Sequence, residues 1–255
     1  MTLAAIAFLK TFAPAVSFAI LFLAERARPA VPAPRGDGRL LRNASLWLSM
    51  AVASPLAGMP LTAFAATHAF WLRPDGAPTL FWFAADLVIL DCWTYFAHRA
   101  YHRIPMMWRL HAPHHLDEHL DTTSAGRFHP LEIIFSALIR MPLIAALAMP
   151  LAHVLLFDML LLLAALFHHS NLRIPQRVER ALSQVIVTPS IHWVHHHAQR
   201  ADTNSNYSGI FSVWDGLFGS RSFTKRTPDM QIGIEGLCDR TPLRLLLAPF
   251  GAPFR

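Results

Sequence analysis

The 255-residue sequence contains few cysteines and few charged side chains. Cys92 and Cys238 are too few and too far apart for a disulfide framework or a paired-cysteine metal site, so both are expected to be ordinary thiols. Charged residues make up only 15% of the chain. Soluble domains usually carry about a quarter. The sequence also has no glycine-rich nucleotide loop and no internal repeat. The charge deficit points to a protein of the bilayer.

Long apolar runs are present instead, and they cover residues 3–24, 44–72, 79–97 and 131–167. A transmembrane helix needs about 20 apolar residues, so the fourth run is too long for one span and predicts a hairpin of two short ones. Pro55, Gly58 and Pro60 interrupt the second run and predict a kink, or a helix that ends and restarts. We therefore predict an all-α, polytopic membrane protein with about four to five transmembrane helices and a cytoplasmic, histidine-rich helical cap.

The distribution of arginine predicts the orientation. The loop at residues 25–42 carries five arginines, whereas the turn at 73–78 carries one. By the positive-inside rule the first loop is cytoplasmic, which places the N-terminus outside and the histidine-rich segment 98–130 inside. No basic segment precedes the first apolar run, so we expect a retained helix there rather than a cleaved signal peptide.

The domain organisation follows from the same pattern. We expect one integral-membrane domain over residues 1–255, made of an N-terminal transmembrane hairpin (1–78), a histidine-rich core (79–220) and a C-terminal tail (221–255). The net charge is +6 and the pI is about 10.1, but the arginines flank apolar runs and form no basic face interleaved with aromatics. Nucleic-acid binding is therefore not expected.

Histidine is the abundant chemical group. Seven of the fifteen histidines lie between His98 and His129. His98 and His102 are four residues apart, which places them on one face of a helix. Two further sets have the spacing i, i+3, i+4 and are expected to present three imidazoles to one point: His111, His114 and His115, and then His192, His195 and His196. Two metal ions sharing eight to ten histidines would satisfy these nitrogens at the membrane boundary.

Other polar residues were weighed against this site. Asp91 lies on the helical face of His98 and His102 and could accept a hydrogen bond from a ligating ring, or else pair with an arginine. Asp86 is left without a role. Four histidines are expected not to be ligands, namely His68, His119, His153 and, as a surface residue, His197.

The histidine-containing segments carry a family resemblance. HRAYH (98–102), HAPHH (111–115) and HWVHH (192–196) resemble the three histidine boxes of the fatty acid hydroxylase and sterol desaturase superfamily. Further segments are similar to landmarks of that family, namely RFHPLE (127–132), HHSN (168–171), TPSIHWVHHH (188–197) and NYSGIFSVWDGLFG (206–219). The resemblance covers roughly residues 85–220, more than half of the chain.

The resemblance implies a membrane oxygenase with two iron ions, with zinc as a substitute. Such an enzyme would hydroxylate or desaturate a lipid, using O2 and electrons from a separate donor protein. Carried over by position, the implied metal ligands are His98, His102, His111, His114, His115, His129, His169, His192, His195 and His196. His169 is preferred to His168 because the family keeps the histidine directly before Ser-Asn. Asn171, Glu132, Asn206 and Tyr207 match landmarks, and hydrogen bonding around the ligands is the role expected of them.

Two other functions compete with this one. A non-catalytic membrane metal-binding or transport protein would hold its ligands near the bilayer midplane, whereas these lie just beyond the span ends. A haem electron carrier would need single facing histidines rather than triplets. The sequence shows no haem, flavin or iron–sulfur motif, so the reductant is expected to be a partner that docks on the basic cytoplasmic face. The substrate stays open among fatty acyl, sterol-like and other isoprenoid lipids, and so does the choice between hydroxylation and desaturation.

Overall fold

The computed structural model describes residues 2–34, 38–74 and 78–251. The regular secondary structure in these ranges is helical, with isolated bridges and no strand. Within them, four helices are long and apolar enough to cross a membrane, judged by length and composition. They are α1 (Leu3–Ala27), the helix Gly38–Thr67, α4 (Thr79–Arg103) and α7 (Leu151–His169). The predicted all-α, multi-pass architecture is confirmed.

The helix Gly38–Thr67 shows how its prolines act. It consists of α2 (Gly38–Ala53), a π-helical turn η1 (Ser54–Gly58) and α3 (Met59–Thr67). The Met59 N–H donates to the Ser54 carbonyl, five residues back, and Pro60 has no N–H to give. The helix therefore continues through a widened turn, and the prolines do not end it.

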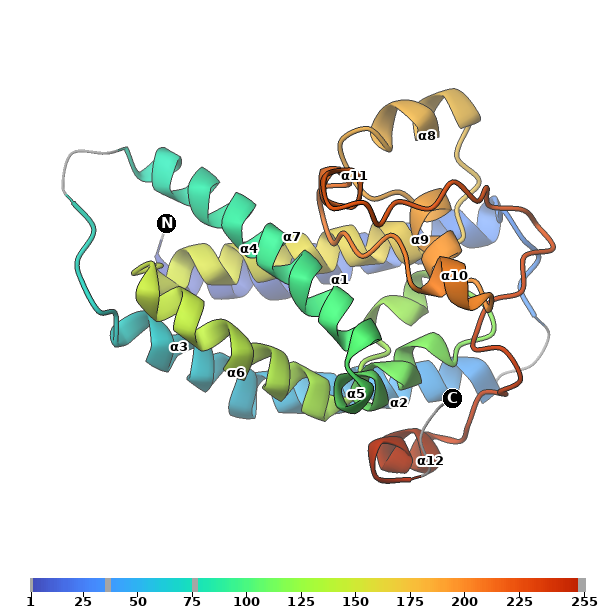
Figure 1. Cartoon of the computed structure of the whole chain (residues 1–255), viewed down its shortest axis with the longest axis horizontal. Helices are drawn as coiled ribbons and strands as arrows, with labels where there is room; N and C mark the ends of the chain where they lie inside the picture. Colours follow the sequence, from blue (N-terminus) through green and yellow to red (C-terminus); the bar gives the residue numbers. More distant parts are fainter. Residues whose placement is uncertain (1, 35–37, 75–77, 252–255) are drawn as a thin grey trace.

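The predicted helical hairpin forms from α6 (Pro130–Ala146) and α7, which run antiparallel through a short turn (Figure 1). α7 is a candidate span, whereas the 17-residue α6 is not. Pro130 begins α6, and the Leu131 N–H is capped by the His129 ring at 3.2 Å. Ala148 in the turn adopts φ of +48°. Because the chain returns to the end from which it left, the segments before α6 and after α7 meet.

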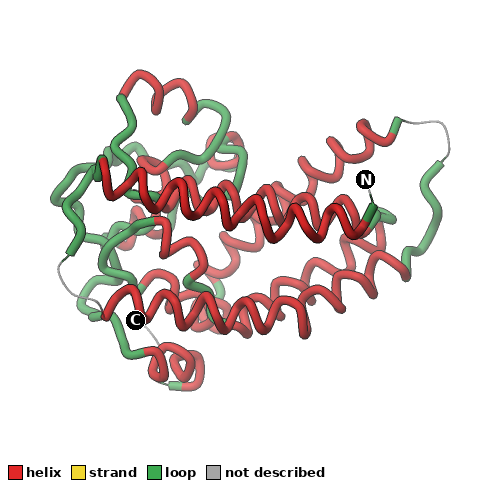
Figure 2. The backbone as a smooth tube through the Cα atoms, turned by 180° about the vertical axis from the view of Figure 1, so that it is seen from behind, coloured by secondary structure: helices red, strands yellow, loops and turns green. Residues whose placement is uncertain are grey.

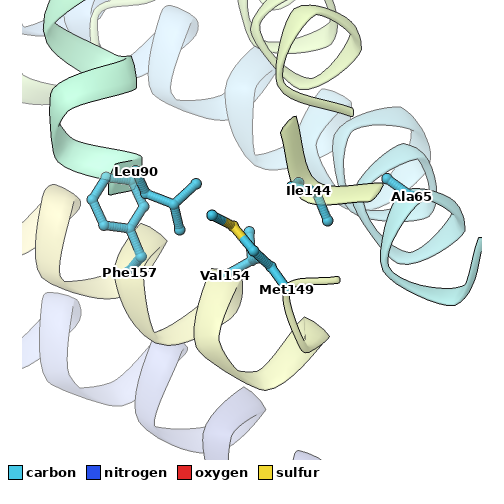
Figure 3. Close-up of a cluster of buried hydrophobic side chains, with 6 residues drawn as sticks. All are labelled: Ala65, Leu90, Ile144, Met149, Val154 and Phe157. Atoms are coloured by element: carbon cyan, nitrogen blue, oxygen red, sulfur yellow. The ribbon is translucent and has the colours of Figure 1, made fainter. Parts of the chain in front are cut away.

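The helices pack in two long pairs, α1 along α7 and α3 along α6, and both figures of the whole chain show them side by side (Figures 1 and 2). The half of the bundle remote from the three histidine boxes has an apolar core, drawn in Figure 3. It is formed by Ala65 of α3, Leu90 of α4, Ile144 of α6, Met149 of the turn, and Val154 and Phe157 of α7. Close packing of such side chains is what holds helices together in lipid.

The outward faces of the long helices are also apolar. Phe8 and Ile20 on α1 are 63% and 61% exposed, and Leu48 on α2 is 68% exposed. Exposed apolar side chains on α1, α2, α3, α4 and α6 suit contact with lipid chains and would be costly in water.

Charged residues inside this apolar bundle are paired. Asp86 on α4 accepts from Arg73 at 2.6 Å and lies 2.7 Å from His153 Nδ1. Asp158 on α7 lies between Lys10 and Arg140, at 3.3 and 2.7 Å. Apolar surroundings require such pairing. Asp86 and His153 therefore have structural partners, and this contact lies far from the three histidine boxes.

The remaining elements form a cap at one end of the bundle (Figure 1). They are α5 (Pro105–His115), η2 (Thr122–Gly126), α8 (Gln176–Leu182), α9 (Pro189–His195), α10 (Arg200–Thr203), α11 (Val213–Leu217), α12 (Pro242–Leu247) and η3 (Ala248–Phe250). The C-terminal ends of α4 and α7 reach the same end. All three histidine boxes are therefore brought together there.

Candidate metal centre

Five histidines from three helices form the first group. α4 supplies His98 and His102, one turn apart, and α5 supplies His111 and His115 in the same relation. Ile104, in extended conformation, turns the chain between these helices, and Pro105 starts α5. His195 of α9 completes the set. One ring nitrogen of each lies within 4.8 Å of those of the others.

Four histidines form the second group, which also satisfies the 4.8 Å criterion. Three of its members meet at His192, whose Nε2 is 2.9 Å from Nε2 of His169 and 3.1 Å from Nε2 of His196. His114 is the fourth, with its Nε2 3.2 Å from that of His169. The rings come from α5, from the last residue of α7, and from α9 with its C-cap.

The two groups are interleaved. Each i, i+3, i+4 set was expected to present its rings to one point, and the structure divides both sets. Positions i and i+4 differ by only about 40° around a helix, whereas position i+3 lies about 100° from i+4. In α5 the pair at i and i+4 enters the five-histidine group and His114 enters the other. In α9 the arrangement is reversed: His192 and His196 enter the four-histidine group and His195 the five-histidine group. The rings of His115 and His196 stack between the groups, 4.2 Å apart.

The hydrogen bonds of the rings show which nitrogen faces inward. The Nδ1 atoms of His98 and His195 lie 2.8 and 2.7 Å from the carbonyl oxygens of Tyr207 and Ser205, and Nδ1 of His169 lies 2.8 Å from that of Ala165. A carbonyl can only accept, so each Nδ1 carries the proton and each Nε2 carries a lone pair. Nε2 of His98 and of His195 is buried without a partner.

These lone pairs fit a metal ion. Nε2 of His169 cannot donate, yet two other imidazole nitrogens lie within 3.2 Å of it. Ligands held at right angles by an ion at 2.1 Å are roughly 3.0 Å apart. Both ring nitrogens of His102 and of His115 are likewise buried without a partner. A cation at the centre of each group would satisfy one inward nitrogen of every ring in that group.

Burial also keeps the imidazoles of the cap uncharged. It lowers the pKa of His111 from 6.5 to about 3. Burial first, and neighbouring imidazoles second, place the pKa of His114 and His115 well below 6.5, and the same holds for His192, His195 and His196. Metal binding needs the neutral ring, so these residues are ready to ligate at neutral pH.

One turn of backbone orients two rings of the five-histidine group. Asn206 has φ of +51°, a conformation that asparagine tolerates better than most residues. Its side chain accepts from the Ser222 N–H and donates to the Ile191 carbonyl. The carbonyls of the residues on either side of it, Ser205 and Tyr207, are the acceptors for His195 and His98.

Asp91 and Asn171 hold loops rather than ligating rings. Asp91 accepts from the N–H groups of Ile210 and Phe211 and from the Trp214 indole, each at 2.7–2.9 Å. Within the described ranges no histidine hydrogen bonds to it, contrary to the suggestion that it accepts from a ligand. Asn171 bonds the Val31 backbone, and its histidine neighbour is His119 at 3.5 Å.

His129 lies outside both groups. Its Nε2 is 3.0 Å from the Leu246 carbonyl and its Nδ1 caps α6, so both ring nitrogens have partners. His168 is also outside, but its ring packs on that of His192 at 4.0 Å and its Nδ1 is buried without a partner. His197 pairs with Asp202, and His68 is exposed.

Some partners of the ligands could not be found from the sequence. The Tyr207, Ser205 and Ala165 carbonyls leave no sequence signal, because every residue has one. Glu132 is different, since its landmark segment predicted hydrogen bonding near the ligands, and its Oε1 lies 2.8 Å from His111 Nδ1.

Comparison with known proteins agrees with this geometry. The chain is similar to ornithine lipid hydroxylase OlsE of Rhizobium tropici, with 34% identity over 182 residues, which is 71% of this chain and 53% of that one. It is also similar to alkylglycerol monooxygenase of Homo sapiens (31% identity, 54% of this chain and 30% of the other) and of Xenopus tropicalis (29%, 58% and 31%). The chain thus spans about half the length of the first relative and under a third of the others. No solved structure matches it significantly. The model of the fatty acid hydroxylase family matches residues 83–220, and the chain belongs to that family.

Proposed function

We propose that the protein is a membrane oxygenase that hydroxylates a lipid. The observation that carries the proposal is the pair of interleaved histidine groups, with inward nitrogens that lack any other partner. Membership of the fatty acid hydroxylase family supports it, and so do the names of the relatives, which are a hydroxylase and a monooxygenase. Those names favour hydroxylation over desaturation.

The proposed ligands are nine of the ten histidines inferred from the sequence. One ion would be held by His98, His102, His111, His115 and His195, and the other by His114, His169, His192 and His196. His129 is left out because both of its ring nitrogens are engaged. Imidazole accepts several first-row metals, and attack on an unactivated C–H bond with O2 requires a redox metal. Iron is proposed among these because the family resemblance implies it.

The residues around the ligands would keep the site rigid and dry. The ring of Phe128 stacks on that of His114 at 4.4 Å, and Trp108 packs 5.1 Å from His102. When bound, the ions would supply the activation of O2 and the one-electron chemistry. The protein would position them, fix the tautomers of His98, His169 and His195 through backbone carbonyls, and exclude water.

The location of the site suits a lipid substrate and an external electron donor. The histidines cluster at the ends of α4 and α7 rather than midway along them, which favours catalysis at the membrane boundary over metal transport through the bilayer (Figure 1). We propose that this end is cytoplasmic and that the N-terminus is outside, because arginines are concentrated on that side. A separate donor protein would dock there.

The test is to compare lipids of cells that express the chain with those of cells that lack it, under 18O2. Incorporation of one labelled oxygen atom into a lipid is expected. His114→Ala should lose metal and product while still inserting into the membrane. His119→Ala should keep both, because His119 lies outside the groups. Full activity of the His114 variant would overturn the ligand assignment, and purified protein that holds zinc and oxidises no lipid would overturn the activity.

A further inference from the structure

A polar cavity of about 180 Å³ opens on the cap, where the chain leaves α1 and α7. Val31, which follows α1, and Leu172, which follows α7, form part of its wall. Both helices are candidate membrane spans, so the cavity lies at the depth where a span meets water. That is the depth of lipid headgroups.

One wall of the cavity carries a guanidinium without an ion-pair partner. Arg226 lies flat on the Trp193 ring, 3.8 Å from its centroid, and donates to Asn171 Oδ1 at 3.3 Å. In the described part of the chain no carboxylate lies within ion-pair distance of it. A guanidinium has five N–H donors, so most of its hydrogen-bonding capacity remains for a ligand. Arg173, which is exposed, lines the same cavity.

The opposite charge is also present. Glu179 lines the cavity, and its Oε1 accepts from the Ser190 N–H at 2.8 Å. The two arginines would attract a bare phosphate dianion, but the Glu179 carboxylate would repel it. Together these charges match a ligand that carries an oxyanion and an ammonium close together, because each charge then meets its opposite.

The side chains that hold Arg226 in this cavity are close in sequence to histidines of the four-histidine group. Trp193 directly follows His192 on α9, and Asn171 comes two residues after His169. Both side chains that hold Arg226 therefore belong to segments that also supply a histidine of that group. A headgroup bound here would be anchored to the elements that form the metal centre.

We propose that this cavity is a headgroup subsite for a zwitterionic lipid, in which Arg226 and Arg173 receive a carboxylate or phosphate and Glu179 receives the ammonium. The inference rests on the proposed lipid substrate. It selects, among lipids, those with both charges in the headgroup.

The test measures binding to the metal-loaded full chain in a nonionic detergent, by thermal shift. The probes are an ornithine lipid (both charges), phosphatidylglycerol (anion only), diacylglycerol (uncharged) and free ornithine (no acyl chains). The ornithine lipid should bind tightest to the wild-type chain. Arg226→Gln should weaken its binding roughly tenfold or more, because a charge-assisted contact is lost. Lys225→Gln, which removes an exposed neighbouring cation, should leave it unchanged.

Glu179→Gln tests the ammonium side of the subsite, as Arg226→Gln tests the anion side. The fold should be kept, because the amide oxygen can still accept from the Ser190 N–H. This substitution should weaken binding of the ornithine lipid and leave phosphatidylglycerol binding unchanged. Equal binding by Arg226→Gln and wild type would overturn the proposal, and so would equal binding of diacylglycerol or free ornithine. If Arg226→Gln loses its metal through misfolding, Arg173→Gln at the exposed position serves instead, with the same expected loss.

These outcomes are separable from those of the proposed activity, because binding is measured without turnover. Selective binding with no lipid oxidised would overturn the activity and support the subsite. Lipid oxidation that is insensitive to Arg226, Arg173 and Glu179 would support the activity and overturn the subsite.

Discussion

Nδ1 of His111 lies 2.8 Å from Oε1 of Glu132, and both side chains are buried. The Nε2 atom of the same ring faces the five-histidine group without a partner. A carboxylate behind a ligating imidazole fixes its tautomer and orientation and makes it a better ligand. This contact joins the start of α6 to the end of α5 and gives the RFHPLE segment a role.

Glu132→Ala is therefore expected to lower metal affinity roughly 10- to 100-fold. Glu132→Gln should lose less, because an amide oxygen still accepts from Nδ1. Metal retained against a competing chelator measures both effects. Equal retention by Glu132→Ala and wild type would contradict a role for the carboxylate at the metal.

Asn206 should be sensitive to substitution for two separable reasons. Asn206→Ala loses the side-chain hydrogen bonds to Ser222 and Ile191 and also places a less tolerant residue at positive φ, at a cost of roughly 1–2 kcal/mol. Asn206→Gly loses the hydrogen bonds alone, because glycine adopts this φ freely.

The expected order of metal retention is wild type, then Asn206→Gly, then Asn206→Ala. Loss of metal should appear first at the five-histidine group. The carbonyls of Ser205 and Tyr207, on either side of Asn206, accept from His195 and His98 of that group. Identical behaviour of the two variants would show that backbone conformation does not contribute.

Arg39 should be required for the stability of the cap. It is 8% exposed and donates to Asp117 at 2.6 Å and to Asp121 at 2.8 Å, which links the start of α2 to the loop after α5. Burial alone would raise the pKa of Asp117, but Arg39 and Arg127 hold it well below its usual value, so the carboxylate stays charged.

Arg39→Ala would leave these two buried carboxylates without their shared cation, and it should reduce the free energy of unfolding by roughly 3–5 kcal/mol. Arg180→Ala, at an exposed position, is the matched control and should change it little. Thermal unfolding of the full chain in detergent compares the two. Similar midpoints for both variants would rule out the proposed contribution.

The metal-free protein should lose stability on mild acidification. The folded-state pKa of His111 is lowered by burial to about 3, below the 6.5 of the unfolded chain, so the unfolded state binds the proton first as the pH falls. The contribution of neutral His111 to the free energy of unfolding is complete above about pH 6.5. It declines by about 1.4 kcal/mol per pH unit from about pH 6.5 down to about pH 3. The other cap imidazoles shift in the same direction.

The measurement is the unfolding midpoint of chelator-treated protein between about pH 7.5 and about pH 5.5. A falling midpoint is expected, and the metal-loaded protein should resist until acid releases the ions. A midpoint that rises over this range in the metal-free protein would contradict the sign of the pKa shift.

Periodicity and composition were sufficient for the helices and for the gathering of the boxes. The apolar runs predicted the spans, and the length of the run at 131–167 predicted the α6–α7 hairpin. The division of each histidine set between two groups could have been obtained from the 100° step of a helix, but which partner each ring meets depends on how α5 and α9 cross. No local pattern encodes that crossing.

The helical face of Asp91 and the family resemblance at His129 suggested roles that differ from the hydrogen bonds these side chains make. Asp91 shares a helical face with His98, yet its carboxylate is taken by backbone N–H groups of the 210–214 segment. His129 sits in a family landmark, yet it is the cap of α6 and meets the Leu246 carbonyl, which comes from a distant part of the chain. Both outcomes depend on tertiary contacts with segments whose positions the sequence does not reveal.

α5 and α9 each supply histidines to both groups, and this has a consequence for how metal ions are loaded. An ion bound in either group would fix the rotation of both helices, and would so pre-arrange the remaining rings for a second ion. Occupancy should therefore be all-or-none, with a sigmoidal titration and a scarcity of singly loaded molecules.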